Sequence, residues 1–331
     1  MVFATVVALR RALYRWRLLK PQVLPVPVIV VGNLIAGGAG KTPTVMAVVR
    51  RLQACGHTPG VISRGHGRRR DALSVMAVLP TTPAADAGDE PLLLRLRLGV
   101  PVFVGIDRVA VARTALAAHP DIDVLVSDDG IQHLRLPRSA QVVVFDERGV
   151  GNGWLLPAGP LRETLTPLPQ PNSVVLYNAP QPSTAWPGHL ATRRLAGLVP
   201  LDAWWAGQAA TMPCLATLAA SATRVTAAAG VSQPERFFDM LRAAGLVITP
   251  LPLPDHHDYT TLPWPAEATD VVVTEKDAVK LRPDRLTAGG TPTRVWVAPL
   301  DFSVDAAFDA ALQAVLPTHF TIRTPDGDAT A

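Results

Sequence analysis

The stretch that decides the fold is VPVIVVGNLIAGGAGKTPT, residues 26–44. Its first part is a run of β-branched apolar residues, which is typical of a strand buried in a parallel sheet. The second part is a glycine-rich loop that closes on Gly40, Lys41 and Thr42, as in the phosphate-binding pattern G-x-x-x-x-G-K-[ST]. Ile35 stands where the opening glycine of that pattern belongs. Because a helix is expected directly after the loop, this stretch predicts a P-loop.

The residue types of this loop suit a triphosphate. Its glycines allow backbone N–H groups to turn toward phosphate oxygens, and the following helix adds its positive N-terminal end. Lys41 is expected to reach the β- and γ-phosphates, and the Thr42 hydroxyl to bind Mg²⁺. A glycine-rich turn without a ligand is the less favoured alternative. The predicted nucleotide-binding residues are Ile35, Ala36, Gly37, Gly38, Ala39, Gly40, Lys41 and Thr42.

Strand-like and helix-like segments alternate along the rest of the chain. This alternation predicts an α/β fold with a P-loop NTPase-like, mostly parallel sheet and a second, smaller α/β domain. Strands are expected at 59–63, 101–105, 123–127, 141–146 and 173–178, with a proline-rich region after them at 180–213. The expected parts are a basic N-terminal helix at 1–24, a P-loop kinase domain at 25–205, a smaller domain closing over the site at 206–324, and a polar tail at 325–331.

Charge is distributed unevenly along the 331 residues, although the net charge is only +4. The first 70 residues hold twelve Lys and Arg and no Asp or Glu, whereas the remainder holds 19 basic and 27 acidic residues. A basic end of this kind favours anionic partners such as phosphorylated ligands, acidic lipid or nucleic acid. The two cysteines, Cys55 and Cys214, are too few for a disulfide framework and suit a reducing cytosol.

The N-terminal segment MVFATVVALRRALYRWRLLK is predicted to form a basic amphipathic helix. Its apolar side carries a tryptophan, and the arginines lie off that side, which suits the plane of a bilayer interface. The uncharged run ends at Leu9, which is too short to span a membrane. A mitochondrial transit peptide and a helix packed on its own domain are the alternatives. The residues expected on the apolar side are Leu9, Ala12, Leu13, Trp16 and Leu19.

Three carboxylates are candidates for a role at the phosphate site. Asp128 and Asp129 end the strand VLVSDDG, as expected for the metal-binding Asp that accompanies a P-loop, although such a pair alone is more often a turn or a cap. Asp89 opens a helix in GDEP. There it is either an N-cap or the base that receives a proton from an attacking hydroxyl, and its position alone does not decide between the two.

Three further motifs have more than one interpretation. SRGHGRRR, residues 63–70, is a solvated basic loop, a nucleic-acid contact or, through Arg64 and Arg68, a holder of an anionic substrate. DHHD, residues 255–258, favours one of its histidines as a proton-transfer partner over a metal cluster. TEKD, residues 274–277, resembles the guanine-reading pattern [NT]-K-x-D, but its lysine comes one residue too late, so ATP is the better prediction.

Together these motifs resemble the tetraacyldisaccharide 4′-kinase family, the lipid A pathway kinases of Gram-negative bacteria. The combination of DDGxQH with GNGxxLPAGPxRE is the most specific part of the match. The matching stretches follow the family's order and cover most of residues 26–282: VPVIVVGNLIAGGAGKTP, SRGHGR, GDEP, SDDGIQHLRL, GNGWLLPAGPLRE, AAGVSQPERFF, PDHHDY and VVVTEKDAVKL.

The resemblance implies an enzyme that transfers the γ-phosphate of ATP, with Mg²⁺, to the 4′-hydroxyl of tetraacyldisaccharide 1-phosphate at the cytoplasmic face of the inner membrane. It implies an acylated disaccharide 1-phosphate and an anionic membrane surface as partners, with no nucleic acid and no obligate protein partner. Carried over to this chain, the catalytic residues are Lys41, Asp89 as the base toward the sugar hydroxyl, and His256 of the second domain as the partner of Asp89. The metal site would contain Thr42, Asp128 and Glu163. The cleft would be lined by Arg64, His66, Asp129, Gln132, His133 and Arg162.

The sequence departs from the family pattern in few places. His66 stands where the family usually has Tyr, and Ile131 replaces a usual Leu. Two other classes compete with a kinase. One is a P-loop switch protein, which hydrolyses nucleotide in response to a protein partner. The other is a nucleic-acid-binding ATPase that uses RGHGRRR and predicts steep salt dependence, although the lack of aromatics in that loop counts against it.

Overall fold

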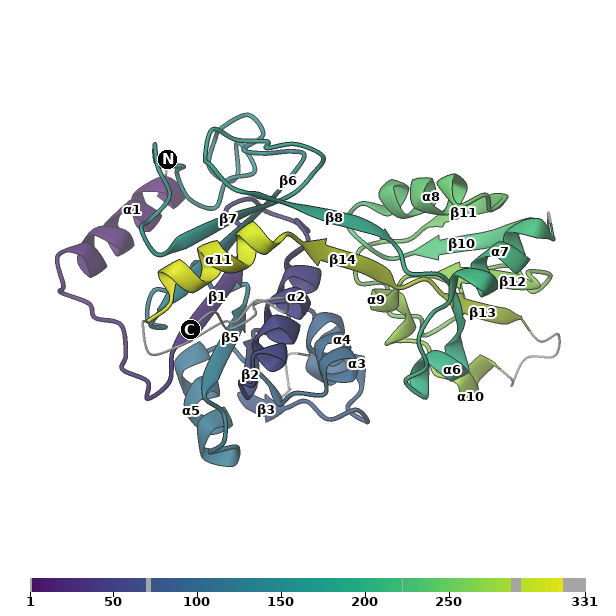
Figure 1. Ribbon diagram of the computed structural model, residues 1–331, viewed down its shortest axis with the longest axis horizontal. Coiled ribbons are helices and arrows are strands. Elements are labelled where there is room, and N and C mark those ends of the chain that lie inside the picture. The colour runs from purple at the N-terminus through teal and green to yellow at the C-terminus, as the bar shows by residue number, and fades with distance from the viewer. Residues whose placement is uncertain (1, 70–72, 222, 287–292, 318–331) are drawn as a thin grey trace, which may run out of the picture.

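The computed structural model describes residues 2–69, 73–221, 223–286 and 293–317 and contains a larger and a smaller β-sheet, each covered by helices (Figure 1). The larger sheet has nine strands in the order β14-β8-β7-β6-β1-β5-β2-β4-β3. Only β3 and β14, at its two edges, run antiparallel to their neighbours. These strands are β1 (Val28–Gly32), β2 (Pro59–Ser63), β3 (Val75–Ala77), β4 (Val102–Gly105), β5 (Val124–Asp128), β6 (Ala140–Asp146), β7 (Ser173–Asn178), β8 (His189–Leu195) and β14 (Leu300–Val304).

Helices pack on both faces of the larger sheet, as a mostly parallel sheet requires. One apolar cluster lies beneath α2, α4 and α11, and a second lies beneath α5. The central strands β1 and β5 are buried along their whole length, which agrees with the apolar residues that make up β1 and the first part of β5. The helices that cover the larger sheet are α2 (Lys41–Ala54), α3 (Ala84–Ala87), α4 (Asp89–Leu98), α5 (Arg108–Ala118) and α11 (Ala306–Val315).

The smaller sheet has five strands in the order β11-β10-β12-β13-β9, parallel except for β9. Its core is centred on α8, which buries Phe237, Phe238 and Leu241. The strands are β9 (Val199–Pro200), β10 (Val225–Ala229), β11 (Ile248–Pro252), β12 (Asp270–Val273) and β13 (Arg294–Val297). The helices are α6 (Leu201–Trp205), α7 (Met212–Ala220), α8 (Pro234–Ala243), α9 (Glu275–Ala278) and α10 (Pro283–Leu286).

The chain passes from the larger sheet to the smaller one after β8 and returns through β14, which pairs with β8. Two features here differ from the expected organisation. The proline-rich region contains β8, whose alternating burial and two arginines give it a weak strand pattern. Residues 300–315, expected in the smaller domain, add a strand and a helix to the larger sheet. The division of the chain at residue 205 stays a prediction, and the expected tail at 325–331 lies outside the described residues.

The N-terminal helix α1 (Val2–Arg15) ends well before residue 24, and Arg17 beyond it has left-handed backbone with φ 61°. One side of this N-terminal segment packs against the protein and the other side is exposed. Val7 and Arg11 turn toward the body of the protein, whereas Leu9 and Trp16 are 56% and 62% exposed. Among the described residues, no helix is both long enough and apolar enough to cross a bilayer.

Candidate active site

The glycine loop lies between β1 and α2 at the carboxyl edge of the larger sheet. Gly37 and Gly40 have φ values of 91° and 90°, a left-handed conformation that favours glycine. A Cβ added at Gly40 would collide with the side chain of Asn178, which donates to the Ala39 carbonyl at 3.3 Å. Ile35 is fully buried. The missing glycine of the pattern is therefore replaced by an apolar side chain that packs beneath the loop.

Lys41 begins α2 and points toward acidic and amide oxygens. Its Nζ lies 3.5 Å from Asn33 Oδ1 and 3.9 Å from Asp129 Oδ2. Arg148 fixes the other side of the loop, since its guanidinium donates to the carbonyls of Ala36 and Gly38 at 3.3 and 3.1 Å. With these carbonyls occupied, the loop can direct its N–H groups toward a phosphate.

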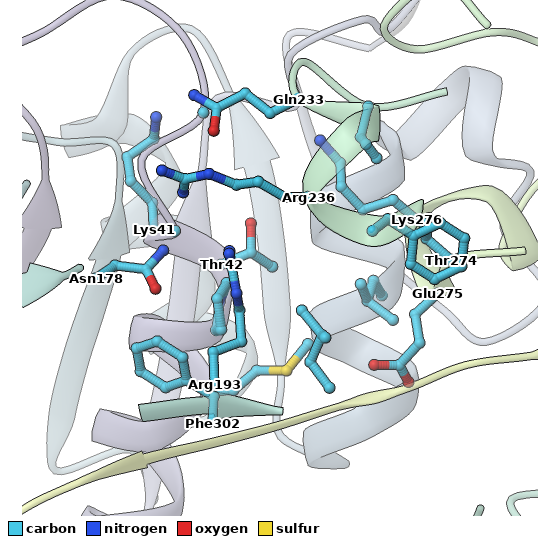
Figure 2. Close-up of a pocket in the computed structure, with 18 of the residues that line it drawn as sticks. Lys41, Thr42, Asn178, Arg193, Gln233, Arg236, Thr274, Glu275, Lys276 and Phe302 are labelled. Atoms are coloured by element: carbon cyan, nitrogen blue, oxygen red, sulfur yellow. The ribbon is translucent and has the colours of Figure 1, made fainter. Parts of the chain in front are cut away.

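A cavity of about 200 Å³ opens beside the loop, between the larger and the smaller sheet. Figure 2 shows Lys41, Thr42 and Asn178 on one side of it, facing side chains that the smaller sheet and its helices contribute. These facing residues were not predicted as part of the site, because they lie far from the loop along the chain and only the packing of the two sheets brings them close to it. They include Gln233, Arg236, Thr274, Glu275 and Lys276.

Asp128 is the most deeply buried carboxylate of the site, at the end of β5 and 1% exposed. Its Oδ2 accepts a hydrogen bond from Ser63 at 3.2 Å, while Oδ1 has no hydrogen-bond partner in the part of the chain that is described. Burial, together with the negative charges of Glu90 and Asp129, raises the pKa of Asp128 to about 7. A buried carboxyl with an unsatisfied oxygen calls for a cation.

Asp129 turns away from its neighbour through a left-handed backbone with φ 50°. It accepts hydrogen bonds from Arg162 at 2.9 and 3.1 Å. Glu163, the residue after that arginine, accepts from Gln132 at 3.0 Å and forms an ion pair with Arg11 of helix α1. The predicted role of Glu163 as a metal ligand stays a prediction, because two donors already engage its carboxylate.

Asp89 lies at the first turn of α4, where Gly88 rather than Asp89 occupies the N-cap. Its Oδ2 accepts hydrogen bonds from His256 Nδ1 at 3.0 Å and from Lys280 Nζ at 3.2 Å. Burial raises the pKa of Asp89, but the hydrogen bond from His256 and the charge of Lys280 outweigh it, so the pKa is lowered overall. His257 does not share this contact and packs its ring against Tyr259, 4.8 Å between centroids.

A second cavity, of about 610 Å³, is lined by all six of the residues expected in the cleft. Arg10 and Arg11 of α1 form part of its wall, so the N-terminal helix borders the site. Glu90 lines both cavities and therefore marks where they adjoin. The predicted cleft residues that line this second cavity are Arg64, His66, Asp129, Gln132, His133 and Arg162, and Asp128 and Glu163 of the predicted metal site line it as well.

Besides the arginines of α1, the basic residue Arg108 also lines this cavity without having been predicted there. Arg108 is only 4% exposed, and burial lowers its pKa to about 10. Burial and the charge of Arg108 lower the pKa of His133 to about 4, so that this histidine is neutral. Arg68, in contrast, is absent from the wall of either cavity, because its guanidinium donates to the carbonyls of Asp86 and Leu73 at 2.7 Å each. Arg68 therefore supports its own loop.

The class of the protein follows from three features: the glycine loop after β1, the buried aspartate at the end of the neighbouring strand β5, and the two adjoining cavities. Together they define a P-loop protein with room for a nucleotide and an acceptor. The family model described as Tetraacyldisaccharide-1-P 4'-kinase matches residues 1–317. The chain belongs to this family of kinases. Chains named tetraacyldisaccharide 4'-kinase from Leptothrix cholodnii and Methylibium petroleiphilum are 57% and 55% identical, with 97% and 95% of this chain covered and 90% and 87% of theirs.

The fold also resembles a solved structure. The crystal structure of the "apo" form of LpxK from Aquifex aeolicus in complex with ATP matches with a TM-score of 0.75 and 25% identity, covering 96% of both chains. This likeness confirms the prediction of a P-loop NTPase-like fold, and family membership confirms the resemblance found in the sequence. A switch protein and a nucleic-acid-dependent ATPase are both disfavoured by it.

Proposed function

We propose that this chain transfers the γ-phosphate of ATP to the 4′-hydroxyl of tetraacyldisaccharide 1-phosphate, the reaction that its family's name describes. The observation that carries the proposal is the meeting of two cavities beside the P-loop. One contains Lys41 and Thr42, and the other is basic and borders the N-terminal helix. The basic wall suits an acceptor that carries a phosphate. Membership of the family alone would not say which cavity binds the nucleotide and which binds the acceptor.

In the proposed reaction, the acceptor oxygen forms a bond to the γ-phosphorus while the bond from that phosphorus to the bridging oxygen of ADP breaks. Lys41 stabilises negative charge on the phosphates. Asp89 receives the proton of the attacking hydroxyl, and His256 holds the carboxylate through the hydrogen bond at 3.0 Å. Packing of the smaller sheet and its loops against α4 keeps Asp89 buried and is proposed to exclude water that would hydrolyse ATP.

The residues of the site fit a divalent cation. The unpartnered, buried Oδ1 of Asp128 is a hard oxygen donor of the kind that Mg²⁺ prefers, and the Thr42 hydroxyl follows the P-loop lysine. We assign the ion to these two side chains. When bound, it would offset negative charge on the phosphates.

Asp128→Asn is expected to raise the Mg²⁺ concentration needed for half-maximal ATP binding by about 10-fold or more, because it removes the charge that holds the ion. Calorimetric titration of ATP at stepped Mg²⁺ concentrations measures this without any acceptor present. Asp107→Asn, which changes the cap of α5, serves as the matched control. An unchanged Mg²⁺ requirement in Asp128→Asn would assign the ion to other residues.

The reaction itself is tested with ATP, Mg²⁺ and the acylated disaccharide 1-phosphate in detergent. Mass spectrometry is expected to show an acceptor that has gained one phosphate, with ADP formed in equal amount. Release of phosphate from ATP without a change in the acceptor would instead support the switch class.

We further propose that α1 binds the anionic cytoplasmic face of the inner membrane through its exposed side. Replacing both Leu9 and Trp16 with Glu is expected to lower binding to phosphatidylglycerol vesicles by about 10-fold or more, because the charged glutamates are costly to bury in lipid. Co-sedimentation measures the bound fraction. The double variant leaves Arg11 and the active-site residues unchanged. Its control replaces Leu79 and Leu262 with Glu, two leucines that are 55% and 42% exposed. Equal vesicle binding by both double variants contradicts the assignment.

A further inference from the structure

The segment TEKDAVK, residues 274–280, packs the smaller sheet against the first turn of α4. The Thr274 hydroxyl caps α9 by accepting from the Asp277 N–H at 3.2 Å, and it donates to Asp277 Oδ2 at 2.7 Å. Lys276 Nζ lies 2.8 Å from Glu90 Oε1. The segment that contains the guanine-like motif TEKD therefore brings two lysines, Lys276 of the motif and Lys280 after it, to the two acidic residues that begin α4.

Lys280 is the more deeply placed of the two lysines, with a side chain that is 5% exposed. Its Nζ lies 3.2 Å from Asp89 Oδ2 and 3.4 Å from Asp277 Oδ1, and 5.4 Å from the centroid of the Tyr259 ring. Asp277 is itself fully buried and accepts from the Gly230 N–H at 3.2 and 3.1 Å. The ammonium group is thus held in place by the smaller sheet and aimed at one oxygen of Asp89.

Both donors to Asp89 use the same carboxylate oxygen. His256 and Lys280 contact Oδ2, so neither of them occupies Oδ1, which is left to accept a proton from an acceptor hydroxyl. An isolated carboxylate as buried as Asp89, which is 7% exposed, would tend to be protonated and would then be useless as a base. A nearby fixed cation offsets that tendency.

We propose that Lys280 is a positioning residue for Asp89: it fixes Oδ2 and keeps the carboxylate ionised, so that docking of the smaller sheet prepares the base for proton transfer. This inference rests on the proposed role of Asp89. Lys280 reaches Asp89 from the segment after α9, whereas Asp89 belongs to α4 beside the larger sheet, so this contact, together with that of His256, links the docking of the smaller sheet to the charge of the base.

The surroundings of Asp89 indicate the direction of the effect. Burial alone would raise the pKa of Asp89, but the contacts with His256 and Lys280 lower it by more than burial raises it. Because only the ionised base accepts a proton, activity is expected to fall as the pH drops through this pKa. Loss of the lysine charge raises the pKa and moves that fall to higher pH. The titratable and charged groups around the Asp89 cluster are His256, Lys280, Glu90, Lys276, Asp255, Tyr259, Asp277 and His66.

The test measures kcat against pH for Lys280→Met. The acidic limb is expected to move up by about one to two pH units, the range that a single opposite charge produces at close approach, with KM for ATP changed less than about twofold. Lys280→Arg, which restores a cation, is expected to return the limb toward that of the unchanged protein. If Lys280→Met does not fold by circular dichroism, Lys280→Gln gives the same readout.

Two controls separate this inference from the proposed function. Arg97→Met breaks another ion pair between α4 and α9, with Glu275 at 3.1 Å, and should leave the acidic limb in place. Asp89→Asn should abolish the limb. An unmoved limb in a folded Lys280→Met or Lys280→Gln variant overturns the positioning role. Near-normal kcat in Asp89→Asn would overturn the assignment of the base instead.

Discussion

Lys41→Ala is expected to lower kcat by about 10²- to 10³-fold, the loss that follows removal of one preorganised charge-stabilising group. Lys41 begins α2 with its Nζ near Asn33 and Asp129, at the end of the loop where we propose that the terminal phosphates bind. Alanine removes the cation while keeping the helix, because alanine has the highest helix propensity. Initial rates at saturating ATP and acceptor measure the effect.

The matched control for this variant is Arg113→Ala, which removes an exposed cation from α5, on the opposite face of the sheet from α2. Its kcat should match that of the unchanged protein. Near-normal phosphate transfer by Lys41→Ala would mean that the loop does not bind the transferred phosphate, and the assignment of the nucleotide cavity would fall with it.

Asp89→Asn is the second large effect, with an expected fall in kcat of about 10²- to 10⁴-fold, the usual contribution of a general base. Asparagine has nearly the same shape but takes up no proton at neutral pH. The pH profile should lose its acidic limb, since that limb reports the ionisation of Asp89. KM for ATP should stay within about twofold, because Asp89 does not line the nucleotide cavity.

Asp86→Asn provides the comparison for this variant, because Asp86 lies three residues earlier and pairs with Arg69 rather than with the site. It should keep both kcat and the pH profile. If Asp89→Asn retained the acidic limb, the proton acceptor would be another group, and the cluster around His256 would have a structural role only.

Features that depend only on the backbone conformation of neighbouring residues could be predicted from the sequence. The P-loop was predictable because β-branched residues favour the strand and glycines permit the left-handed turns at Gly37 and Gly40. Asp128 at the end of β5 and Asp129 directly after it were predictable because buried parallel strands expose their carboxyl ends at one edge of the sheet. The strand β8 was missed, since a strand that is only half buried and carries two arginines lacks that apolar run.

The sequence by itself therefore determined the class of the protein, the phosphate loop and the family, because each depends on residues adjacent along the chain. The resemblance implied that His256 partners Asp89, but only the tertiary structure decided that it is His256 and not His257 that contacts Asp89, 167 residues away, and that Lys280 contacts the same oxygen. It also decided that Glu163 pairs with Arg11 of the N-terminal helix. The physical reason is that these contacts depend on how α1 and the two sheets dock, which is a property of packed surfaces and not of local backbone preference.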